Sequence, residues 1–197
     1  MKLSHLFPAL AGALLLAGCV TPVGPVQVTR FHVEDVSPLG KGTISVEPAP
    51  GTDGNSIEWQ TYRAAVMRQL QRVGYTEAGP GTGGQVAWLK VTRSTFRPDG
   101  GSGPVSVGVG GSTGSYGSGV GLGIGINLSP KPKEQVATEL AVSIKDRTSG
   151  ATLWEGRASF TVATSSPLAG TALAAPKMSE ALFLNFPGQS GETIEVK

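Results

Sequence analysis

VATELAVSIKDRTSGATLWEGRASFTV, residues 136–162, carries the strongest folding pattern in the chain. Apolar and polar side chains alternate over 136–144 and again over 152–162, which is the period of a β-strand with one buried face. The five residues between the two runs, DRTSG at 146–150, are types that favour turns. The pattern predicts an antiparallel hairpin whose core face is formed by Leu140, Val142, Ile144, Leu153, Phe160 and Val162.

Two amphipathic helices are expected outside this hairpin. One covers residues 56–73, where a single helical face collects Trp59, Tyr62, Val66, Leu70 and Val73. Asn55, with Glu58 three residues later, resembles a capping box, and Gly74 suits the position just after the helix. The other helix covers 167–186, and Pro176 inside it is expected to kink it or to begin a second helix.

Further strands are expected at 26–33, 42–46, 85–97 and 193–196. Together the elements predict an α+β fold, with an antiparallel β-sheet, two helices packed on one face and a glycine-rich β-hairpin insertion. The three tryptophans, Trp59, Trp88 and Trp154, are expected in or near the core.

The insertion occupies residues 100–128. Twelve of the 26 residues from Gly100 to Gly125 are glycine, and branched apolar residues alternate with small ones on both sides of a flexible turn. This period predicts a long hairpin with one apolar face. Such strands have little to fix their register unless that face is covered. Either the hairpin packs on its own domain, or residues 104–128 dock on an envelope protein, a membrane or a second copy.

The N-terminus predicts a lipoprotein signal peptide over residues 1–18. Lys2 precedes an apolar run from Leu6 to Leu16 that is too short to span a bilayer. Leu16, Ala17, Gly18 and Cys19 then resemble the lipobox of bacterial lipoproteins. That resemblance implies cleavage before Cys19 and the attachment of diacylglycerol and a fatty acid such as palmitate. We therefore expect lipid attachment at Cys19, a tether over 19–26 and a single α+β domain over 27–197. By resemblance to the sorting of enterobacterial lipoproteins, Val20 in place of Asp favours the outer membrane, with the domain facing the periplasm.

Composition argues against several functional classes. The net charge of +2 is too small for nucleic-acid binding, and one cysteine with two histidines excludes a disulfide framework and a Cys/His zinc site. Residues 110–114, GGSTG, match the pattern of a hydrolase nucleophile elbow, but no helix is expected after them. The histidine of the mature chain is His32. No catalytic, cofactor-binding or metal-binding residue is therefore expected.

Several stretches resemble the bacterial lipoproteins of the family called domain of unknown function 4136. They are the lipobox over 16–19, the helix from Tyr62 to Tyr75, the DRTSGATLWEG stretch over 146–156 and the terminal helix that ends in Phe186 and Pro187. The resemblance covers about 28–188. It implies a lipid-anchored α+β domain and supplies no catalytic residues.

The leading functional hypothesis is a non-enzymatic lipoprotein that serves as a binding or assembly module in the bacterial envelope. One alternative is a lipid-anchored periplasmic hydrolase that uses Ser112 or a carboxylate. The other is a structural protein that self-associates through the glycine-rich hairpin.

Overall fold

The computed structural model describes residues 24–98, 105–114, 117–126 and 133–197, and over 105–126 it describes the backbone alone. The first part of the chain forms β1 (Val26–His32), β2 (Thr43–Pro48), α1 (Ile57–Arg72), β3 (Thr76–Glu77) and β4 (Gln85–Phe96). After the insertion come β7 (Gln135–Asp146), β8 (Thr152–Ala163), the 3₁₀ turn η1 (Pro167–Ala169), α2 (Thr171–Phe183) and β9 (Thr193–Val196).

Seven strands form one sheet in the order β3-β2-β4-β7-β8-β1-β9. The predicted α+β class is confirmed, but the expectation of a wholly antiparallel sheet is wrong. β2 pairs in parallel with both β3 and β4, whereas the other pairs are antiparallel. The reason is α1, which crosses over from the end of β2 to the start of β3 and so returns the chain in the same direction.

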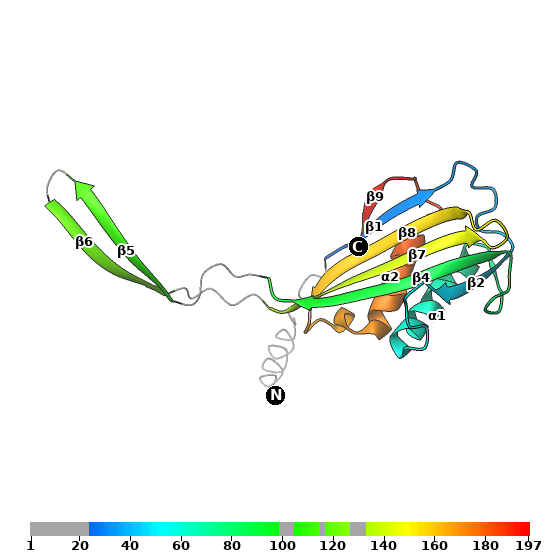
Figure 1. Cartoon of the computed structure of the whole chain (residues 1–197), viewed down its shortest axis with the longest axis horizontal. Coiled ribbons are helices and arrows are strands. Elements are labelled where there is room, and N and C mark those ends of the chain that lie inside the picture. The colour runs from blue at the N-terminus through cyan, green and yellow to red at the C-terminus, as the bar shows by residue number, and fades with distance from the viewer. Residues whose placement is uncertain (1–23, 99–104, 115–116, 127–132) are drawn as a thin grey trace, which may run out of the picture.

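Both helices lie on one face of the sheet (Figure 1), as predicted. The apolar face of α1 is buried at Trp59, Tyr62, Val66 and Leu70. The core-facing residues of β7 and β8 are buried beneath the helices. A single core therefore fills the space between two helices and one face of the sheet. None of the helices in the described residues lies on the opposite face of the main sheet, which we call the helix-free face (Figure 1).

The helix ends differ from prediction in two places. Ser56, not Asn55, caps α1, because its hydroxyl accepts a hydrogen bond from the Trp59 N–H at 3.2 Å. The Asn55 N–H is instead bound to the Asp53 carboxylate in the preceding turn. Pro176 lies inside α2 and begins no second helix, since α2 already starts at Thr171. The break in the predicted helix falls at Gly170, between η1 and α2.

The β7–β8 hairpin confirms the strongest prediction and corrects part of it. Asp146 shapes the turn by accepting hydrogen bonds from the N–H groups of Thr148 and Ser149. Trp154 is fully buried in the core, whereas Leu153, expected on the core face, is only partly buried and packs against the core. Trp88 lies on the helix-free face, where the Lys145 ammonium is 4.4 Å from its ring centroid.

The predicted glycine-rich hairpin falls on β5 (Val105–Gly114) and β6 (Gly117–Ile126), which pair with each other in a separate two-stranded antiparallel sheet. Residues 99–104 and 127–132, which join β5 and β6 to the main sheet, lie outside the described residues. The expectation that its apolar face is covered stays a prediction.

Candidate functional site

The end of β1 carries the site that fits a binding role best. A cleft of about 150 Å³ opens there, which we call the β1 cleft, and it is lined by Phe31, His32, Val33, Thr152, Leu153, Trp154 and Glu155. Phe31 is 54% exposed and Val33 is 39% exposed. Phe31 lies directly opposite Glu155 on β8, so both project from the helix-free face of the sheet. The β1 cleft therefore presents two exposed apolar side chains beside one carboxylate.

The backbone edge of β1 beside this cleft is covered by the loop that follows α2. β9 pairs with β1 only over Val26–Thr29. Beyond that point the Gly191 N–H donates to the Arg30 carbonyl at 2.8 Å, and the His32 N–H donates to the Ser190 hydroxyl at 3.1 Å. A loop thus occupies the place of a neighbouring strand along the last residues of β1.

His32 is held between two backbone carbonyls. Its Nδ1 lies 2.7 Å from the Val33 carbonyl oxygen and its Nε2 lies 3.3 Å from that of Gly188. Both partners are acceptors, so a neutral imidazole can donate to only one of them. A neutral ring therefore donates one hydrogen bond to the main chain, and its unprotonated nitrogen lies against the other carbonyl oxygen.

Arg30 fixes α2 behind the cleft. Its side chain is buried, and its Nε and Nη2 donate to the carbonyls of Leu182 and Ala181 at 3.0 and 3.1 Å. A guanidinium at the C-terminal end of a helix satisfies carbonyls that have no partner within the helix. Burial lowers the pKa of Arg30, and the carboxylate of Glu192 opposes this effect. Arg30 is therefore a structural residue that sets the position of α2 against β1.

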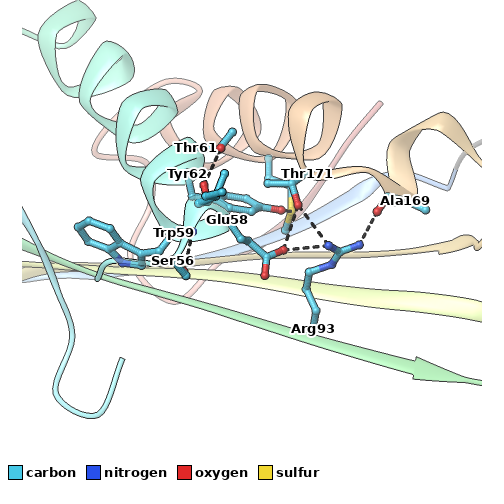
Figure 2. Close-up of polar contacts among 10 residues, drawn as sticks. Ser56, Glu58, Trp59, Thr61, Tyr62, Arg93, Ala169 and Thr171 are labelled. Carbon is cyan, nitrogen blue, oxygen red and sulfur yellow. Dashed lines mark hydrogen bonds and ion pairs between the residues drawn. The ribbon is translucent and has the colours of Figure 1, made fainter. Parts of the chain in front are cut away.

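A second polar cluster joins the N-terminal ends of both helices to β4 (Figure 2). Arg93 forms an ion pair with Glu58 at 2.8 Å and donates to the hydroxyl of Thr171 at 3.2 Å and to the carbonyl of Ala169. Thr171 in turn donates to the Glu58 carboxylate at 3.0 Å. This Glu58–Arg93–Thr171 cluster ties α1, α2 and β4 together.

Tyr62 lies beside this cluster and is fully buried. Its hydroxyl is 3.8 Å from the sulfur of Met178 in α2. Burial raises the pKa of Tyr62 to about 12, because an anionic phenolate would lose its hydration. The buried phenol is thus a packing group between the helices and stays protonated at neutral pH.

A second cleft, of about 250 Å³, opens beside the start of α1. Its lining includes Asp53, Ser56, Glu58, Trp59 and Lys90. The Asp53 carboxylate, the Ser56 hydroxyl and the Glu58 carboxylate already bind partners within the domain. Both clefts are smaller than the 300–1,000 Å³ usual for small-molecule sites. The β1 cleft is about the size of one apolar side chain, which suits the docking of a protein segment.

The residues singled out in the sequence fall in different places. Cys19 and the lipobox residues Leu16, Ala17 and Gly18 lie outside the described residues, so lipid attachment stays a prediction. Ser112 lies within β5, opposite Gly119, and its side chain is not described. Among the residues that the structure describes, no three His, Cys, Asp or Glu side chains are grouped to hold a metal. No helix in the same residues is both long and apolar enough to cross a bilayer.

The sequence reasoning missed the β1 cleft, although a pattern in β1 points to it. Val26 and Val28 are fully buried, and the next position on their face is the buried Arg30. Phe31 and Val33 have the opposite parity and therefore project from the other face. Apolar residues thus occupy even positions at Val26 and Val28 and odd positions at Phe31 and Val33. This change of parity indicates an apolar surface outside the core.

Comparisons with known proteins agree with the resemblance noted above. The family model of the domain of unknown function DUF4136 matches residues 30–188. An uncharacterized protein of Zymomonas mobilis subsp. mobilis is 32% identical over 215 residues, which cover 88% of this chain and 80% of that protein.

Two solved structures are similar to part of this chain. A PDZ domain protein from Parabacteroides distasonis has a TM-score of 0.48 at 11% identity, covering 88% of this chain and 39% of that one. The PelC dodecamer from Paraburkholderia phytofirmans has a TM-score of 0.45 at 11% identity, covering 84% of this chain and 99% of the PelC chain. The match of the family model over most of the chain, together with the Zymomonas relative, shows that this protein belongs to the DUF4136 family.

Proposed function

We propose that the protein is a non-enzymatic lipoprotein whose domain binds another envelope protein through the β1 cleft. Acyl chains on Cys19 hold it at the periplasmic face of the outer membrane. The lipobox over 16–19 supports the anchor, because a cysteine at that place after an apolar run is typical of lipid attachment. Two or more acyl chains are needed for stable anchoring, and this modification supplies them.

One observation supports the binding role above the others: β1 begins seven residues after the proposed anchor and ends at the β1 cleft. Val26, the first residue of β1, lies seven positions after Cys19, and Phe31 lies five positions further along the strand. At about 3.3 Å per residue, Phe31 is about 17 Å beyond Val26. The anchor therefore leaves the domain at one end of β1, and the exposed apolar side chains lie at the other end, where a protein in the periplasm can reach them.

The chemistry of the β1 cleft favours binding over catalysis. Apolar and aromatic side chains dominate its lining, and such residues are enriched at the centres of protein interfaces. Its histidine contacts two backbone carbonyls, whereas a general base needs a nitrogen within reach of a substrate proton. An apolar side chain of a partner, flanked by a group that pairs with Glu155, is the occupant that this lining fits.

Photo-crosslinking in living cells tests this proposal. A photoreactive amino acid is placed at Val33 in the β1 cleft and, as a matched control, at Glu139 on the exposed middle of the helix-free face. We expect Val33 to capture one envelope protein that the Glu139 position does not capture. The captured protein is then identified and its affinity for the wild-type chain is measured. Phe31→Asp should weaken that affinity at least tenfold, because it replaces the exposed aromatic side chain that would contact the apolar group of the partner with a hydrated carboxylate.

Other outcomes would contradict the proposal. Identical adducts from Val33 and Glu139, or an affinity unchanged by Phe31→Asp, would exclude the β1 cleft as the binding surface. An adduct of this chain with itself that persists at Val33 would favour self-association instead. A variant that lacks residues 101–128 distinguishes the β1 cleft from the glycine-rich hairpin. If this deletion abolishes the adduct and Phe31→Asp does not, the glycine-rich hairpin is the binding arm.

A further inference from the structure

The end of the domain from which the anchor departs can be located by strand register. Gln27 pairs with Ser159 on β8, so Val26, one residue earlier, is level with Phe160. Phe160 pairs with Thr138 on β7, and Thr138 pairs with Arg93 on β4. The first residue of β1 is thus level with Arg93, three strands away. At about 4.8 Å between neighbouring strands, the two positions are about 14 Å apart across the sheet. The Glu58–Arg93–Thr171 cluster therefore marks the anchor-side end of the domain.

Large apolar side chains are exposed around this cluster. Ile57, next to Glu58, is 87% exposed, and Leu173, two residues after Thr171, is 52% exposed. We call these two residues, Ile57 and Leu173, together with Ala172, which is exposed in the first turn of α2, the anchor-side patch. Isolated exposed apolar residues are ordinary in proteins, but these flank one cluster at one end.

The sequence around the patch is also free of charge. No charged residue occurs between Arg157 and Lys177, a stretch that includes the end of β8, η1 and the first turns of α2. The first helical position of α1 is occupied by Ile57, where the N-terminal end of a helix favours Asp, Glu, Ser, Thr or Pro. The contacts within the domain do not account for this isoleucine, since it is the most exposed large apolar residue described.

The length of the tether keeps this end near the bilayer. Seven peptide units separate Cys19 from Val26, and a fully extended chain spans at most about 3.6 Å per residue, or about 25 Å in all. Acyl chains hold Cys19 at the membrane surface, so Val26 stays within that distance of the lipid. Because the tether is short, the effective concentration of the domain near the lipid is high. Weak contacts between the domain and the lipid surface are then sufficient for docking.

We infer that the anchor-side patch rests on the lipid surface, with Ile57 and Leu173 inserted at the boundary between head groups and acyl chains. This inference rests on the proposed lipid anchor. The domain then stands on the membrane with β1 pointing away from it, and the β1 cleft faces the periplasm. Apolar contact, not charge, drives the docking, because the charged residues nearest the strand ends, Arg97, Lys133 and Glu134, sum to only +1. Docking should therefore change little between low and high salt.

Depth-dependent fluorescence quenching tests the orientation. The chain contains one cysteine, and acylation removes its thiol, so a new cysteine can be labelled selectively. The acylated protein is reconstituted into vesicles of phosphatidylethanolamine and phosphatidylglycerol that contain brominated lipid. An environment-sensitive fluorophore is attached to Ile57→Cys or Leu173→Cys and, as matched controls at the opposite end, to Val36→Cys or Leu184→Cys. The control side chains are 38% and 41% exposed.

We expect quenching at positions 57 and 173 to exceed that at 36 and 184 at least twofold, with a blue-shifted emission. Equal quenching at both ends, or stronger quenching at 36 and 184, would overturn the inference. Ala172→Cys provides a further label if a variant fails to fold, as judged by circular dichroism. Mass spectrometry of each sample beforehand separates the two claims: an unacylated protein refutes the proposed anchor, whereas an acylated protein without quenching refutes the docking alone.

Discussion

The indole of Trp154 lies over Gly156, two residues further along β8. A Cβ atom placed on Gly156 would lie 2.2 Å from Cη2 of Trp154 and 2.8 Å from Cδ1 of Leu182 in α2. The absence of a side chain at 156 therefore makes room for the largest fully buried side chain of the core. This contact explains the spacing of tryptophan and glycine at the end of the DRTSGATLWEG stretch.

Gly156→Ala should destabilise the domain by about 2 kcal/mol, because overpacking a filled core displaces side chains and backbone. Gly24→Ala is the matched control, since nothing lies within 4 Å of a Cβ at that position, and it should change stability by less than about 0.5 kcal/mol. Urea denaturation of both variants measures the difference. Equal free energies of unfolding for Gly156→Ala and the wild type would show that the indole is not confined there.

The ion pair between Glu58 and Arg93 should contribute only modestly to stability. Both side chains are partly exposed, at 41% and 29%, so solvent screens their attraction. A double-mutant cycle with Glu58→Gln and Arg93→Gln should give a coupling energy of about 0.5–1 kcal/mol, which decreases in 1 M NaCl. A coupling energy of zero at low salt would mean that the Glu58–Arg93–Thr171 cluster does not hold the helices to β4.

Tyr62 should limit stability at alkaline pH. Its pKa is raised to about 12 in the folded protein, whereas an unfolded tyrosine titrates near 10. The stability that the buried phenol provides is therefore complete below about pH 10 and is lost as the pH rises toward 12. Tyr62→Phe should flatten the fall in the free energy of unfolding across this range, measured by urea titration at each pH. An unchanged slope would indicate that the phenol ionises without penalty.

Glu47 should limit the stability of the domain at acid pH, as Tyr62 does at alkaline pH. Burial alone would raise the pKa of this carboxyl, but hydrogen bonds from the Ser45 hydroxyl, the Gly81 N–H and Arg147 outweigh it and lower the pKa. The resulting stability is present above about pH 4.3, the ordinary value for glutamate, and is lost as the pH falls through the lowered pKa.

Glu47→Gln should therefore reduce the loss of stability between pH 5 and pH 2. Glu180→Gln, on the exposed side of α2, is the control and should leave the acid profile as in the wild type. Circular dichroism against pH measures both profiles. A Glu47→Gln profile that matches the wild type would show that the contact with Arg147, at 2.5 Å, does not favour the carboxylate.

Much of the architecture could be predicted because periodicity alone specifies it. The alternation over 136–162 and the stripe from Trp59 to Leu70 are patterns of single elements, and the structure confirms both. The parallel placement of β2 could not be obtained in this way. It depends on where α1 returns the chain, which is a property of packing between elements distant in the sequence.

The candidate sites were less predictable for a related reason. The β1 cleft combines β1 with the start of β8, which lies more than 115 positions later in the chain. Arg30 is buried on the core face of β1, but a pattern of apolar residues cannot identify a charged residue as part of the core. The cap of α1 was misplaced by one residue because Asn55 and Ser56 are both good capping residues, and only the turn at Asp53 selects between them. The lipobox, by contrast, is purely local and is visible in the sequence alone.

The intact mass of the protein extracted from bacterial membranes tests the account most directly. We predict a chain that begins at Cys19 and carries a diacylglyceryl group and an amide-linked fatty acid, recovered with the outer membrane. Cys19→Ala should abolish the added mass and leave residues 1–18 attached. A wild-type chain that retains Met1, or that begins near residue 19 without acyl groups, would contradict the anchor and with it the orientation of the domain.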